Sequence, residues 1–136
     1  MVKAILLLLA LLMIPGCASV SARKVVTLEP YQHIFVVERL NENHRLNEFL
    51  VSELRRLGRD ASTGPLTMIP DNTQAVLTYD ARWEWDFQTY VIELTLELYT
   101  THTNKKLADA RYYQPSIHPK PPGEVARAII NRMFAK

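Results

Sequence analysis

An alternation of apolar and polar residues between positions 77 and 98 constrains this fold more than any other feature. Its first half places Leu77, Tyr79, Ala81, Trp83, Trp85 and Phe87 at every second position, and its second half does the same with Ile92, Leu94, Leu96 and Leu98. A period of two is typical of a strand with one buried face. We therefore expect two antiparallel strands joined at Gln88-Thr89, and pairing Phe87 with Tyr90 puts both apolar sets on one face.

Shorter patterns complete a single domain. Residues 33–38 favour a strand, and residues 43–57 favour a helix that Asn41 or Asn43 caps and Gly58 ends. Residues 59–68 predict a loop or a short edge strand. Ala108, Ala110 and Tyr112 continue the inner face on a third strand, and residues 124–134 predict a final helix.

The order β-α-(β)-β-β-β-α predicts a two-layer α+β domain, with two helices on one face of a mostly antiparallel sheet. In this arrangement Trp83 and Trp85 fill the space beneath the helices, because aromatic residues on an inward strand face usually belong to the core. The alternative is that the two tryptophans form a platform for a ligand.

The N-terminal segment predicts an exported protein. Lys3 is followed by an unbroken apolar run from Ala4 to Ile14, which is too short to span a bilayer comfortably, and then by small residues. We interpret residues 1–16 as a signal peptide, residues 17–24 as a lipidated tether and residues 25–136 as the folded periplasmic domain. The alternative for the first segment is a buried helix, but it lacks the polar face of such a helix.

Ile14-Pro15-Gly16-Cys17 resembles the lipobox of bacterial lipoproteins, and Cys17 is the only cysteine of the chain. The resemblance implies cleavage before Cys17, a diacylglycerol on its sulfur and an acyl chain, such as palmitate, on its amino group. In that family an aspartate after the cysteine favours retention in the inner membrane, and here the position is Ala18. We therefore expect the periplasmic side of the outer membrane rather than the inner membrane. The alternative is a secreted protein without lipid.

The element order, together with the lipobox, resembles small outer-membrane lipoproteins such as the LptE-type lipopolysaccharide-assembly lipoproteins and the auxiliary lipoproteins of ABC-type transport systems. The resemblance implies a non-catalytic partner of a larger membrane machine. It implies no individual site residue, because no motif beyond the lipobox carries it.

The residue composition predicts neither an enzyme nor a nucleic-acid binder. Sixteen Lys and Arg nearly balance fourteen Asp and Glu, whereas a general nucleic-acid binder needs a basic surplus. His33, His44, His102 and His118 have no second ligand at metal-binding spacing, so we expect surface histidines and no metal. With four glycines and no phosphate-binding loop, the sequence indicates no cofactor.

The polar face of the predicted three-stranded part of the sheet is a candidate partner surface. It carries Asp80, Arg82, Glu84, Glu93, Glu97 and Arg111, together with Asp86 and Asp109. The expected register sets Glu84 opposite Glu93 and Asp80 opposite Glu97, and such like-charge pairs are mildly destabilising. A register shifted by two would set Arg82 opposite Glu97. A basic partner would relieve an acidic excess, and the alternative is a plain solvated face.

A second candidate surface is the basic group near the first helix, Arg45, Arg55, Arg56 and Arg59. It predicts contact with anionic lipid headgroups beside the anchor, with helix capping and solubility as the alternative.

The sequence as a whole favours a lipid-anchored, non-enzymatic lipoprotein that binds or stabilises another envelope component, most simply a protein. The alternative function is a module that binds lipid or another small hydrophobic molecule.

Overall fold

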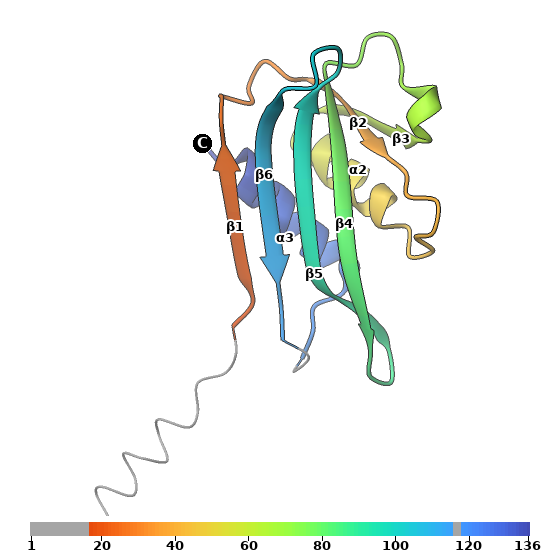
Figure 1. Cartoon of the computed structure of the whole chain (residues 1–136). Helices are drawn as coiled ribbons and strands as arrows, with labels where there is room; N and C mark the ends of the chain where they lie inside the picture. The colour runs from red at the N-terminus through yellow and green to blue at the C-terminus, as the bar shows by residue number, and fades with distance from the viewer. Residues whose placement is uncertain (1–16, 116–117) are drawn as a thin grey trace, which may run out of the picture.

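The computed structural model describes residues 17–115 and 118–136, so the predicted signal peptide lies outside the described residues. These residues form a six-stranded mixed sheet with two helices on one face (Figure 1). Along the chain the elements are β1 Ser19–Lys24, β2 His33–Val37, α2 Leu46–Arg56, β3 Asp60–Gly64, the 3-10 helix η1 Leu66–Met68, β4 Ala75–Trp85, β5 Thr89–Thr100, β6 Lys106–Tyr113 and α3 Pro122–Phe134. The predicted two-layer α+β class is confirmed.

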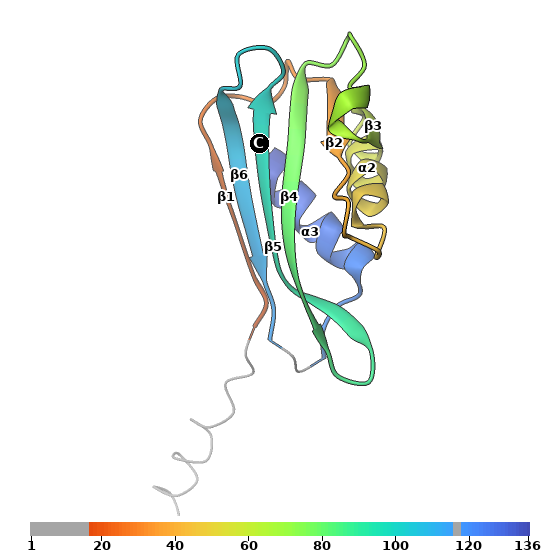
Figure 2. The same ribbon diagram turned by 45° about the vertical axis from the view of Figure 1, so that its right-hand side comes forward.

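The strands lie in the order β1-β6-β5-β4-β2-β3. The pairs β1–β6, β6–β5 and β5–β4 are antiparallel, whereas β2 runs parallel to both β3 and β4. β2 and β3 run parallel because the helix between them, α2, returns the chain to the end of the sheet where β2 began. Figure 2 shows both helices on the same side of the sheet.

The core lies between this sheet face and the helices. α2 contributes Leu46, Leu50, Val51 and Leu54, α3 contributes Val125, Ile129, Ile130 and Met133, and the sheet contributes among others Leu77, Leu94, Leu96, Ala110 and Tyr112. Each fully buried aliphatic side chain of this kind stabilises the fold by about 1.5–3 kcal/mol. The alternation that predicted β4, β5 and β6 thus identifies most of their buried residues.

The start of α2 differs from the prediction, because neither Asn41 nor Asn43 caps it. The carboxylate of Glu42 instead accepts the backbone N–H of His44 at 2.6 Å and that of Leu46 at 3.0 Å. A glutamate can reach back to these groups because Arg45 turns the chain through a left-handed conformation, with φ of 57°. At the other end Gly58 has φ of 83°, as the predicted helix end requires.

The predicted tether is wrong for residues 19–24, which form β1. Val20 pairs with Tyr112 and Ala22 with Ala110, and Arg23 forms an ion pair of 2.8 Å with Asp109. The backbone bonds that β6 offers outweigh the weak strand pattern of these small residues. The folded domain therefore begins two residues after Cys17.

The pairing of β4 with β5 also differs from the prediction. Arg82 lies opposite Glu93 and Thr78 opposite Glu97, and a bulge between Arg82 and Trp83 shifts the register toward the hairpin tip. Neither of the two registers considered from the sequence occurs. Because the bulge adds a residue on one strand, a uniform alternation could not reveal it.

Candidate functional site

Cys17 lies at one end of the sheet. It is exposed, and only Ala18 separates it from the first residue of β1, Ser19, which pairs with Tyr113. A group attached to the Cys17 sulfur would therefore sit directly against the folded domain rather than on a flexible arm. No helix within residues 17–115 and 118–136 is long and apolar enough to cross a membrane.

The tip of the β4–β5 hairpin extends at the same end of the molecule (Figures 1 and 2). Trp85 is 72% exposed and Phe87 is 93% exposed, with their ring centroids 6.2 Å apart. Phe87 takes a left-handed conformation in the turn, with φ of 60°. The prediction that Trp85 fills the core is wrong, because the hairpin reaches beyond the layer of helices that would cover it.

Trp83 has a different environment from Trp85. Its side chain packs partly against the core, and the His44 ring lies across it with centroids 4.0 Å apart and planes tilted by 30°. The indole Nε1 is buried without a hydrogen-bond partner among the described residues. The core role predicted for Trp83 therefore holds in part, and a ligand platform shared with Trp85 is not formed.

The polar sheet face brings together the predicted strand residues, and most of their charges are paired; Glu84 and Asp86 have no ion-pair partner among the described residues. Glu93 lies between Arg111 at 3.1 Å and Arg82 at 3.5 Å. The hydrogen bond from Arg111 lowers the pKa of Glu93, since it favours the ionised carboxylate. Glu97 bonds to Lys106 at 2.9 Å, and this contact likewise lowers its pKa.

Three basic residues that the sequence interpretation left out complete this face. Arg39 pairs with Asp80 at 2.9 Å, Arg23 pairs with Asp109, and Lys106 pairs with Glu97. The expected acidic excess is therefore mostly offset, because a loop, β1 and β6 each supply a base to one of the acids Asp80, Asp109 and Glu97. The sequence does not indicate Arg23 because residues 19–24 lack a clear strand pattern, and it does not indicate Arg39 because that residue approaches β4 from a loop.

The four arginines of the predicted basic group do not form one surface. Arg45 pairs with Glu48 at the start of α2, while Arg55 at its other end donates to the Ala61 carbonyl at 2.8 Å. Arg56 bonds to Glu53 at 2.6 Å. The eleven residues of α2 separate its two ends by about 16 Å. The four arginines therefore cannot all contact lipid headgroups beside Cys17.

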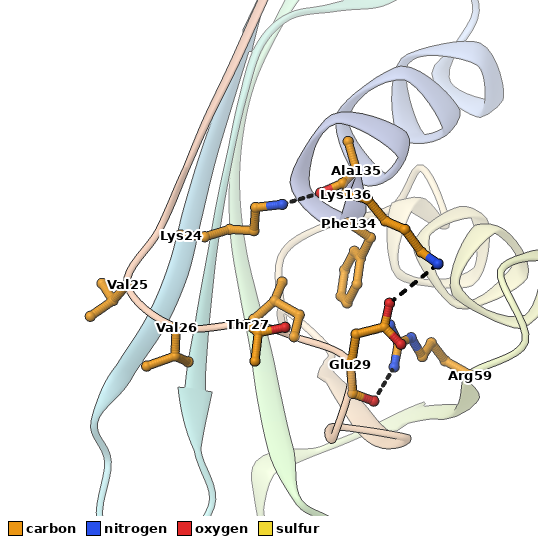
Figure 3. Close-up of a pocket in the computed structure, with 10 residues that line it drawn as sticks. Lys24, Val25, Val26, Thr27, Glu29, Arg59, Phe134, Ala135 and Lys136 are labelled. Carbon is orange, nitrogen blue, oxygen red and sulfur yellow. Dashed lines mark hydrogen bonds and ion pairs between the residues drawn. The ribbon is translucent and has the colours of Figure 1, made fainter.

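Arg59 belongs instead to a hollow of about 570 Å³ at the far end of β1. Figure 3 shows its guanidinium beside Phe134, whose ring centroid lies 5.2 Å away, with Lys24 reaching the Ala135 carbonyl. Arg59 also donates to the carbonyls of Glu29 and Tyr31, both at 3.1 Å. Lys24 and the terminal Nη1 of Arg59 are thus bonded within the hollow, whereas Arg59 Nε is buried without a hydrogen-bond partner among the described residues.

The described residues hold no group of three His, Cys, Asp or Glu side chains suited to a metal ion. His44, His102 and His118 are exposed and His33 is half-buried beside Asp60, 2.8 Å away. The predicted surface position is confirmed for the first three histidines, and His33 is only partly exposed. The features left as a candidate site are the end with Cys17 and the aromatic tip, and the polar sheet face.

Comparison with known proteins identifies the fold. A point variant of the PelC dodecamer from Paraburkholderia phytofirmans matches with a TM-score of 0.62 and 18% identity over 88% of this chain and 95% of PelC. A second structure of that dodecamer gives 0.64 and 16% over 88% and 96%. A minor lipoprotein from Acinetobacter baumannii matches more weakly, with a TM-score of 0.44 and 19% identity over 77% and 92%. Neither a family model nor a curated protein matches the sequence.

At these identities the PelC likeness establishes the fold alone. It shows that the six-stranded sheet with two helices is an architecture that natural proteins use over nearly the whole length of such a chain. The resemblance to LptE-type and ABC-transport auxiliary lipoproteins stays a prediction.

Proposed function

We propose that this protein is a lipid-anchored, non-enzymatic domain that binds or stabilises another component of the bacterial envelope. The observation that carries the proposal is the position of Cys17, which ends the lipobox-like segment and lies at the same end as the exposed Trp85 and Phe87. A diacylglycerol on Cys17 and two exposed aromatic rings would then meet one membrane surface. Several acyl chains give stable anchoring, where a single chain would be marginal.

The residue after the cysteine supports a location at the outer rather than the inner membrane. Ala18 stands where an aspartate would favour the inner membrane, so we place the domain on the periplasmic side of the outer membrane. The alternative function, binding of a small hydrophobic molecule, has less support. The hollow at the end of α3 is lined by the charged residues Lys24, Arg59 and Lys136, and Lys24 and Lys136 already bond to neighbouring residues.

Intact-mass spectrometry tests the anchor. The full-length chain and a Cys17→Ser variant are produced in a bacterium with an outer membrane, beside Ser19→Ala as a matched control. We expect the parent and Ser19→Ala to mature at Cys17 with added diacylglycerol and acyl mass, and Cys17→Ser to keep the uncleaved precursor mass. A mature parent protein with an unmodified Cys17 would contradict the proposal.

Separation of inner and outer membranes by density then tests the location. We expect the lipidated parent in the outer-membrane fraction, and Ala18→Asp to move it toward the inner membrane. An unchanged distribution for Ala18→Asp would show that this position does not direct the protein.

A further inference from the structure

The border of the sheet formed by β1 presents backbone groups that have no partner among the described residues. The Val25 N–H donates to the Leu107 carbonyl at 2.9 Å, which fixes the phase of the antiparallel ladder between β1 and β6. Ser19, Ser21 and Arg23 then exchange bonds with β6, because bonded residues alternate along such a ladder. The N–H and C=O groups of Val20, Ala22 and Lys24 point to the free side, where β1 is the edge of the sheet (Figure 1).

The opposite border, β3, is protected in ways that β1 is not. Arg55 donates to the outward carbonyl of Ala61, and Pro65 follows the last residue of the strand directly. Charges and prolines of this kind prevent a further strand from adding to an edge. β1 pairs with β6 over six residues without a bulge, and its first four side chains, SVSA, are small.

The two charged residues of β1 do not block the edge. Arg23 is held by Asp109 on the polar face, and Lys24 reaches the Ala135 carbonyl on the helix side. The free side therefore stays open over the length of the strand, next to Cys17.

We propose that this edge receives an extended strand from a different envelope protein. Backbone bonds to Val20, Ala22 and Lys24 would supply affinity, as in other cases of strand addition. The added strand runs antiparallel to β1, carries small apolar side chains beside Val20 and Ala22, and begins with acidic residues beside Arg23 and Lys24. Its end then lies beside Cys17, at the membrane.

A second copy of this chain does not fit as the added strand if both copies are anchored through Cys17. This argument rests on the proposed function. Two β1 strands related by a two-fold axis would pair antiparallel, and a six-residue strand is about 20 Å long. The Cys17 of the second copy would then lie at the end away from the membrane. Pairing between β1 and β3 of a second copy is opposed because the outward Ala61 carbonyl of β3 already accepts a hydrogen bond from Arg55.

Hydrogen exchange on the lipidated protein in detergent tests this edge. The probe is an acetylated octapeptide that begins with two glutamates and continues with alternating valine and threonine. We expect the amides of Val20, Ala22 and Lys24 to exchange about tenfold more slowly with saturating peptide, because they become hydrogen-bonded. The amides of Ser19, Ser21 and Arg23, already bonded to β6, should change little.

An Ala22→Pro variant sharpens the test. It removes a donor only on the free side, where a strand tolerates proline, so the ladder with β6 remains. We expect Ala22→Pro to lose the peptide effect and Ala22→Ser, which keeps the N–H, to retain it. If Ala22→Pro fails to fold, a peptide N-methylated on its bonding side gives the same comparison with the parent protein, and it should protect no amide.

Three outcomes would overturn the proposal. They are no protection by the peptide, equal protection of all six amides, and self-association of the lipidated protein that Ala22→Pro abolishes. The last would assign the edge to a second copy. The anchor is judged separately, because the mass of mature Cys17 does not depend on peptide binding.

Discussion

Trp83 and Trp85 lie two residues apart on β4, yet their side chains meet different surroundings. Trp83 packs against the core and against His44, while Trp85 lies beyond the helices and is mostly in solvent. The difference comes from where the second layer ends along the strand. An alternating pattern indicates which face of the sheet a side chain occupies, but it does not indicate how far along the strand the helices cover that face.

Truncation of each tryptophan should therefore have unequal effects. We expect Trp83→Ala to lower the free energy of unfolding by about 2–4 kcal/mol, somewhat less than a fully buried tryptophan. Trp85→Ala should change it by less than about 0.5 kcal/mol, as at other exposed positions. Urea unfolding followed by circular dichroism measures both, and equal losses would contradict the assigned environments.

The glutamates of the polar sheet face form the second residue-scale test. Glu93 and Glu97 accept bonds from Arg111 and Lys106, so replacing both with glutamine removes favourable contacts. We expect the urea midpoint of Glu93→Gln with Glu97→Gln to fall. Glu84→Gln is the matched control, because the described residues place no ion-pair partner beside Glu84, and its midpoint should stay level. A higher urea midpoint for the double variant would contradict this and would indicate that the acidic side chains of this face repel one another.

At the scale of elements, Glu53 joins the two helices. It is 7% exposed, and its carboxylate accepts bonds from Arg56 of α2 at 2.6 Å and from Arg127 of α3 at 3.2 Å. Burial raises the pKa of Glu53, but the hydrogen bonds from the two arginines outweigh burial, and the net pKa lies below the ordinary value. The contact thus depends on the ionised carboxylate.

The sign of the pH dependence follows from this lowered pKa. Because the folded state holds the proton less tightly than the unfolded state, the contribution is complete above the ordinary glutamate pKa and disappears as the pH falls through the folded value. We expect Glu53→Gln to cost about 1–2 kcal/mol at pH 7, since both arginines are partly exposed, and clearly less at pH 3. Urea unfolding at the two pH values measures this, and a pH-independent loss would contradict it.

The elements themselves were predictable where the pattern was long. The alternation gave β4, β5 and β6, and helical spacing with Gly58 located α2. β1 was missed because SVSARK has no strong alternation, and its pairing depends on β6, almost ninety residues away in the chain. The candidate site was predictable only at Cys17, since ion pairs such as Arg82–Glu93 depend on a register that a single bulge displaces.

At the scale of the whole molecule, β1 gives the domain a fixed polarity. Cys17 and the hairpin tip mark one end, and the hollow with Lys24, Arg59 and Phe134 marks the other (Figures 1 and 3). Because only Ala18 links Cys17 to β1, a lipid anchor would hold the domain close to the bilayer with its strands pointing away from it. The proposed partner edge would then stand along the membrane normal.

This polarity predicts that Trp85 contacts lipid while the other end does not. Indole rings favour the headgroup region, and Trp85 and Phe87 are exposed at the end that carries Cys17. In vesicles containing brominated lipids, we expect the lipidated protein to show quenched tryptophan emission, and Trp85→Phe to lose most of that quenching while Trp83 still emits. The acyl chains dominate binding, so the amount of protein on the vesicles should not change.

The matched control is Val25→Trp made in the Trp85→Phe protein, which places a tryptophan at the opposite end of the domain. This variant should restore tryptophan emission without restoring its quenching by brominated lipid. Equal quenching of tryptophans at positions 25 and 85 would mean that the domain lies flat on the bilayer rather than standing on it.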